Sequence, residues 1–122
     1  MLRTLLRSAK ASVLFVVLLL AVPAFAHSHP VTMLPAADST VSAPGKVEIH
    51  FSEGLEPKFS SITVVSAEGH VVTKETSKLD DADNKHLWLA LPALTPGLYT
   101  VKWVAAAVDG HRSTGEYKFT VK

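Results

Sequence analysis

Short runs of alternating polarity constrain the fold of this chain more than any other feature of its sequence. In one run, Val47, Ile49 and Phe51 alternate with Glu48 and His50, which places the apolar residues on one side of an extended chain. Turn-forming dipeptides and polar stretches separate such runs. The predicted strands cover residues 31–34, 46–52, 59–66, 70–73, 86–91, 98–107 and 116–121. About seven short strands predict an all-β domain, a small Greek-key β-barrel or immunoglobulin-like sandwich.

The first 26 residues have a different pattern. A basic start with Arg3, Arg7 and Lys10 precedes an apolar run at residues 13–22 and then Ala24-Phe25-Ala26, the three-part pattern of a secretory signal peptide. The run is shorter than the roughly 20 apolar residues that span a bilayer, although an uncleaved anchor is the alternative. We therefore expect a signal peptide at 1–26, a domain at 27–122, and a periplasmic protein without stable membrane insertion after cleavage.

Removing this leader changes the charge balance. The whole chain has 12 lysines and arginines against 11 aspartates and glutamates, but three of the basic residues belong to the leader. The remaining 96 residues are faintly acidic and contain no basic stripe, so we expect no nucleic-acid partner. The chain also has no cysteine and six histidines. Any metal ion must therefore be held by nitrogen and oxygen ligands.

Cleavage before His27 would give that residue a free α-amine. The amine has a pKa of about 7.7–8.0 and the imidazole a pKa of about 6.5, and the two can chelate one metal ion when both are deprotonated. His29 follows two positions later, and Asp109 and His111 have the same spacing between the last two predicted strands. Residues at i and i+2 of an extended segment point to the same side, so each pair can present both side chains to one ion.

Together these groups offer four nitrogens and one oxygen. This set suits Cu(II), which favours tetragonal nitrogen and oxygen ligation and stands at the top of the Irving–Williams order; zinc is the next candidate. The spacing does not establish that the two pairs meet, and the alternative is a pair of solvated histidines beside an ordinary Asp-Gly turn. The other internal histidines, His50, His70 and His86, are expected to be surface residues rather than ligands.

Several motifs carry a family resemblance that covers the 96 residues after the leader. They are His27 directly after Ala-Phe-Ala, LPAADS at 34–39, VEIHFSE at 47–53, PGLYTVKW at 96–103 and DGHRSTG at 109–115. With these motifs the chain closely resembles the CopC family of periplasmic copper-binding proteins.

The resemblance implies a Greek-key β-barrel or sandwich that binds Cu(II) through the N-terminal amine, His27, Asp109 and His111, with His29 as a further ligand. It also implies association with an inner-membrane copper protein of the CopD type. Some members hold Cu(I) in a methionine-rich loop, because thioether is a soft ligand. This chain has only Met1 and Met33, so we expect one Cu(II) per chain and no strong Cu(I) site.

The leading hypothesis is a Cu(II)-binding protein for copper resistance, storage or delivery, with no catalytic turnover. A local site is an alternative way to hold the ion: the amine, two backbone amides and the His29 imidazole can surround Cu(II) without His111. An N-terminal histidine with a second histidine also resembles the histidine brace of copper polysaccharide monooxygenases, which makes an oxidative copper enzyme the main rival. A β-sandwich interaction module is the third hypothesis.

Overall fold

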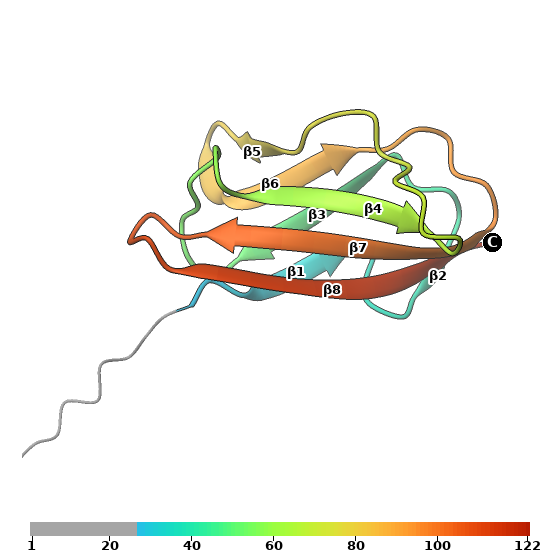
Figure 1. Ribbon diagram of the computed structural model, residues 1–122, viewed down its shortest axis with the longest axis horizontal. Helices are drawn as coiled ribbons and strands as arrows, with labels where there is room; N and C mark the ends of the chain where they lie inside the picture. Colours follow the sequence, from blue (N-terminus) through green and yellow to red (C-terminus); the bar gives the residue numbers. More distant parts are fainter. Residues whose placement is uncertain (1–26) are drawn as a thin grey trace, which may run out of the picture.

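The computed structural model describes residues 27–122, which form a sandwich of two four-stranded β-sheets (Figure 1). The predicted signal peptide lies outside the described residues. The strands are β1 (Pro30–Leu34), β2 (Thr40–Val41), β3 (Lys46–Phe51), β4 (Ser61–Ser66), β5 (Lys78–Asp80), β6 (Asp83–Ala90), β7 (Gly97–Ala106) and β8 (Arg112–Val121).

One sheet has the order β1-β3-β6-β5 and the other the order β2-β8-β7-β4. All neighbouring strands are antiparallel except β2 and β8, which run parallel. Crossovers between the sheets bring segments from distant parts of the chain to the same end of the sandwich. The predicted all-β fold is confirmed. No helix in residues 27–122 is long and apolar enough to cross a membrane.

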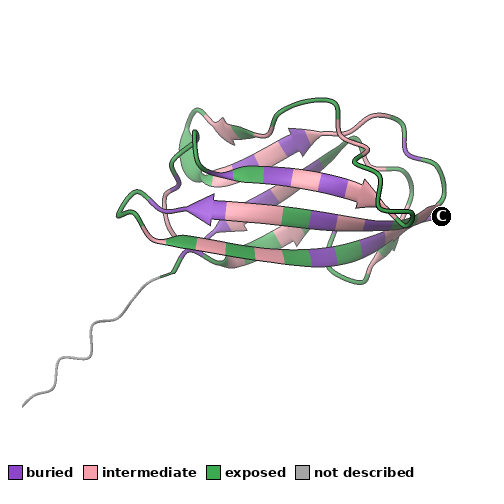
Figure 2. Ribbon diagram, in the orientation of Figure 1, coloured by how far each residue is buried: buried purple, intermediate pink, exposed green. Residues whose placement is uncertain are grey.

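Alternation of apolar and polar residues explains how the sheets pack. In β3, Val47, Ile49 and Phe51 are buried while the residues between them are partly exposed. The same alternation runs along β7 and β8, where buried and exposed positions succeed one another (Figure 2). The apolar faces meet in one core, and burial of these side chains is the main force that holds the sheets together. The core comprises Val47, Ile49, Phe51, Leu55, Ile62, Val64, Leu87, Leu89, Leu94, Tyr99, Val101, Ala105, Tyr117, Phe119 and Val121.

The strand predictions differ from the structure in several places. The predicted strand at 70–73 is wrong: this segment makes only an isolated bridge between Val71 and Val65. Strands β2 and β5 were not predicted, because two or three residues are too few to show an alternating pattern. The last strand begins at Arg112 rather than residue 116, because pairing with β7 extends through polar residues that lack an alternating pattern.

Candidate metal centre

Residues 27–29 are fixed at one end of the sandwich by hydrogen bonds to both sheets. Ser28 is buried, its carbonyl accepts a hydrogen bond from Ser113 Oγ at the start of β8, and its own hydroxyl donates to the Glu53 carbonyl over 3.4 Å. The backbone N–H of His29 donates to Ser52 Oγ over 3.1 Å, and the Ser52 N–H donates to the His29 carbonyl over 2.9 Å. His27 and His29 flank the buried serine and are both exposed.

The Asp109–His111 segment lies in the tight β7–β8 connection at the same end (Figure 1). The Ala107 N–H donates to the His111 carbonyl over 2.8 Å, and the Gly110 N–H donates to the Ala107 carbonyl over 2.9 Å. Gly110 has φ of 93°, a left-handed conformation that glycine adopts without steric cost. The Val108 N–H also donates to the Gly54 carbonyl, so the loop is braced against the segment that follows β3.

The structure brings His27 and His111 together. Their ring centroids are 5.5 Å apart with an interplanar angle of 78°. An ion about 2.0 Å from one nitrogen of each ring lies roughly 3 Å from each centroid, so two rings that share an ion have centroids up to about 6 Å apart. The observed separation is therefore compatible with a shared ion, although 84 positions separate the two residues in the sequence.

Asp109 holds His111 in position. One carboxylate oxygen, Oδ1, accepts the His111 backbone N–H over 3.0 Å, and Oδ2 lies 2.9 Å from His111 Nδ1. The backbone hydrogen bond and then the side-chain hydrogen bond from His111 lower the pKa of Asp109 below its usual value. When Nδ1 donates to the carboxylate, Nε2 carries the lone pair, an arrangement that orients a histidine toward a metal. Asp109 therefore orients His111 in this geometry.

His29 makes different contacts from the other predicted ligands. Its Nδ1 lies 3.1 Å from Ser52 Oγ and 3.2 Å from the His27 carbonyl oxygen. Within residues 27–122, no three histidine, aspartate or glutamate side chains lie close enough together to hold a metal ion in this geometry. Of the four predicted ligands, His27, Asp109 and His111 therefore lie in one group, linked by the His27–His111 and Asp109–His111 contacts. The His29 ring is turned toward Ser52 instead. Sequence reasoning missed Ser28, Ser52 and Ser113, which position the segment, because serine at these places carries no recognisable metal-ligating pattern.

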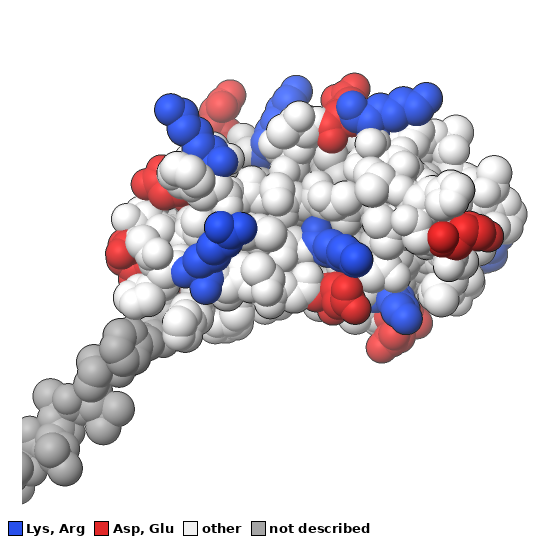
Figure 3. Space-filling model, in the orientation of Figure 1, with Lys and Arg blue, Asp and Glu red and all other residues white. Residues whose placement is uncertain are grey.

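Beside the loop, the surface is hollowed and partly apolar. The hollow has a volume of about 430 Å³, and it is lined by Glu56, Phe59, Ala106, Ala107, Val108, Gly110 and Arg112. Phe59 is 65% exposed and Val108 is 60% exposed. On the face drawn in Figure 3, charged side chains of both signs are interspersed. The loop that carries Asp109 and His111 therefore borders a partly apolar, exposed hollow.

The remaining internal histidines make other contacts. His70 is exposed in the turn after β4. His50 and His86 are paired across β3 and β6, and their rings stack with centroids 4.1 Å apart. Both are partly buried rather than fully exposed, because each covers the other and His86 also contacts Glu48.

Comparison with known proteins agrees with these features. The CopC domain family matches residues 30–122. Protein YobA of Escherichia coli K12 is 37% identical over 100 residues, which cover 80% of this chain and 81% of that protein. The crystal structure of CopC from Methylosinus trichosporium OB3b superimposes with a TM-score of 0.75 at 37% identity, over 79% of this chain and 94% of that one. PcoC of Escherichia coli, described as a methionine-rich copper resistance protein, gives a TM-score of 0.65 at 38% identity, over 80% of this chain and 100% of that one. This chain belongs to the CopC family.

Proposed function

We propose that this protein binds one Cu(II) in the periplasm, for copper resistance, storage or delivery. The proposed ligands are the α-amine of His27, the imidazoles of His27, His29 and His111, and Asp109. The observation that carries the proposal is the 5.5 Å separation of the His27 and His111 rings at the end of the sandwich where Ser28 is buried. In this site His29 joins the other ligands by rotating its ring away from Ser52.

Hydrogen bonding supports the shared site over the local one. A local site that uses backbone amides would need the deprotonated amide nitrogens of Ser28 and His29 to face the ion. The His29 N–H instead donates to Ser52, and Ser28 is buried with its carbonyl bonded to Ser113. Deprotonating the His29 amide for the local site would remove its hydrogen bond to Ser52, at a cost of about 1 kcal/mol. The shared site leaves this backbone hydrogen bond in place and loses only the contact between the His29 ring and Ser52.

The number of ligands supports binding without turnover. Four nitrogens and a carboxylate nearly fill the coordination sphere of copper, whereas metal catalysis requires an open position for water or substrate. The relatives compared above include a copper resistance protein and none described as an enzyme. An oxidative copper enzyme remains the rival function, and it predicts oxygen consumption that depends on a reductant.

The methionine content supports Cu(II) rather than Cu(I). PcoC is described as methionine rich, whereas this chain has two methionines, of which only Met33 lies in the described domain. Thioether ligands are the ones that select Cu(I). We therefore assign no strong Cu(I) site.

An inner-membrane copper protein of the CopD type is the proposed partner. The exposed Phe59 and Val108 and the hollow between them border the proposed copper ligands, so a protein docked there would lie beside the ion. The leader sequence and the family support the periplasm as the compartment.

Copper titration of the processed protein in competition with a strong chelator tests this function. We expect one tightly held equivalent of Cu(II), no tight Cu(I), and no ascorbate-dependent oxygen consumption beyond that of a sample without copper. Failure to compete with the chelator would favour the interaction module. Sustained oxygen consumption by the copper form would favour the enzyme.

A further inference from the structure

A second histidine cluster lies on the outer face of the β1-β3-β6-β5 sheet. His50 and His86 face each other across β3 and β6, and their neighbours Ile49 and Leu87 point into the core. The two imidazole rings stack with an interplanar angle of 13°. Regular strand pairing thus fixes two potential ligands side by side on a solvent-facing surface.

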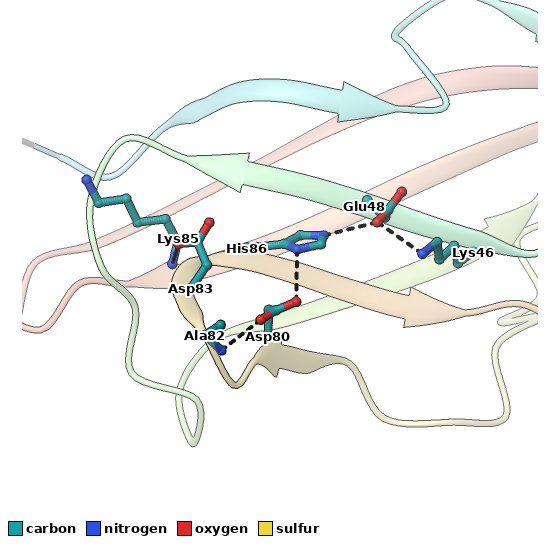
Figure 4. A network of polar contacts seen from close by, with 7 residues as sticks. All are labelled: Lys46, Glu48, Asp80, Ala82, Asp83, Lys85 and His86. Carbon is teal, nitrogen blue, oxygen red and sulfur yellow. Dashed lines mark hydrogen bonds and ion pairs between the residues drawn. The ribbon is translucent and has the colours of Figure 1, made fainter.

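His86 lies between two carboxylates (Figure 4). Its Nε2 is 3.1 Å from Glu48 Oε1, and its Nδ1 is 3.7 Å from Asp80 Oδ2. Glu48 also pairs with Lys46 Nζ over 3.2 Å, so the lysine balances its charge. The Glu48 contact fixes the plane of the His86 ring and leaves Nδ1 directed toward Asp80. A carboxylate that bonds one imidazole nitrogen while the other binds metal is a common arrangement at zinc sites.

Asp80 is also fixed in orientation. Its Oδ1 accepts the Ala82 N–H over 2.8 Å in the β5–β6 turn (Figure 4). The pairing register of β5 with β6 shifts between Leu79 and Asp80, an irregularity of the kind that redirects a side chain. Asp80 Oδ2 therefore faces His86 Nδ1, while the other carboxylate oxygen, Oδ1, is held by the backbone N–H of Ala82.

The 3.7 Å distance between His86 Nδ1 and Asp80 Oδ2 suits a shared metal ion better than a direct hydrogen bond. It exceeds the roughly 2.7–3.2 Å of an N–H···O hydrogen bond. A nitrogen and an oxygen each about 2.0–2.1 Å from a tetrahedral zinc lie about 3.3 Å apart, so closing on the ion takes a movement of about 0.4 Å. Neighbouring ligands in a square plane would lie only about 2.9 Å apart, which makes the gap a poorer fit for Cu(II).

We propose that Asp80, His86 and His50 form a second metal site, for zinc, on the outer face of the sheet. His50 becomes the third ligand when its ring rotates out of the stack, and water completes the tetrahedron. Glu48 is a positioning residue that orients His86 and does not touch the ion. The site uses no residue of the proposed copper centre.

Zinc titration followed by NMR of the histidine side chains tests this proposal, because each imidazole is observed separately. In the processed protein with His111→Ala, which removes one ligand of the proposed copper centre, we expect Zn²⁺ to shift the His50 and His86 resonances together, with one equivalent bound at this cluster. Asp80→Asn keeps an oxygen for the Ala82 N–H and should weaken zinc binding there at least about 10-fold. Glu48→Gln should weaken it about 10-fold through the orientation of His86.

Asp81→Asn is the matched control, since Asp81 is an exposed neighbour outside the cluster. Zinc that leaves the His50 and His86 resonances unmoved would overturn the proposal, as would equal zinc affinity in the Asp80→Asn and Asp81→Asn proteins. Neither result tests the proposed copper centre at His27, because copper binding is measured in a separate titration with Cu(II).

Discussion

Two histidine clusters of this protein are built in opposite ways. The terminal cluster, His27, His29, Asp109 and His111, joins a chain segment before the first strand to a turn between the last two. The outer-face cluster, Glu48, His50, Asp80 and His86, stands on paired strands within one sheet. The terminal cluster depends on loops that are held by a few hydrogen bonds. The geometry of the outer-face cluster is set by the pairing register of its strands. Segments in loops rearrange more easily than paired strands, so we expect the backbone of the terminal cluster to adjust more on binding an ion than that of the outer-face cluster.

His111→Ala separates the two clusters with the largest effect. Cu(II) affinity should fall by more than the roughly 10–100-fold that loss of an outer-shell partner causes, because a direct ligand is removed. Competition with a chelator measures the loss, and the Cu(II) spectrum should change as well. His70→Ala, which removes an exposed histidine from a distant turn, should bind copper as the wild type does. Unchanged affinity and spectrum in His111→Ala would instead establish the local site at His27-Ser28-His29.

Ser113→Ala tests whether the terminal cluster depends on the anchoring of its backbone. The change leaves the buried Ser28 carbonyl without its side-chain donor, so the free energy of unfolding should fall by about 1 kcal/mol. We expect a comparable loss in Cu(II) binding, about fivefold, since the amine and His27 are then less well positioned.

Thr114→Ala on the same strand is the control, because Thr114 is exposed. Denaturant unfolding and copper titration measure the two effects. Equal behaviour of the two variants would show that the Ser28–Ser113 bond does not organise the cluster. The outer-face cluster should be unaffected in both variants.

The smallest expected effect is the titration of Asp109 in the metal-free protein. Hydrogen bonds from His111 lower its pKa in the folded state, so its carboxyl group should titrate below the unperturbed value of about 3.9. The ionised carboxylate therefore contributes its full stabilisation of the folded state at pH values above the unperturbed pKa. This contribution is lost as the pH falls through the lowered pKa of the folded state. NMR of the carboxyl carbon measures the midpoint. A midpoint at or above the unperturbed value would contradict the two hydrogen bonds.

The sequence predicted the sheet strands where alternation was long enough to detect, as at residues 46–52. It also singled out all four residues of the terminal cluster, because each pair lies two positions apart. Residue spacing alone did not predict that His27 and His111 lie close together, and only the family resemblance implied it. Their proximity depends on the Ser28 contacts with Ser113 and Glu53.

The outer-face cluster was missed for a related reason. His50 and His86 were interpreted as separate surface residues because 36 positions separate them and no short motif contains both. Their proximity follows from the register of β3 with β6. The orientation of Asp80 follows from an irregularity within a strand too short to be predicted. A strand register is a property of the folded sheet, and the hydrophobic pattern of each strand alone does not fix its partner.

The α-amine of His27 is the ligand that most distinguishes the proposed copper centre, and it can be tested directly. Cu(II) titration should compare the correctly processed protein with a version that carries one extra glycine before His27. The extension converts the amine into an amide, so we predict a loss of Cu(II) affinity of about 100-fold or more, with folding unchanged. Equal affinity in the two proteins would contradict the account, because the ion would then be held without the amine.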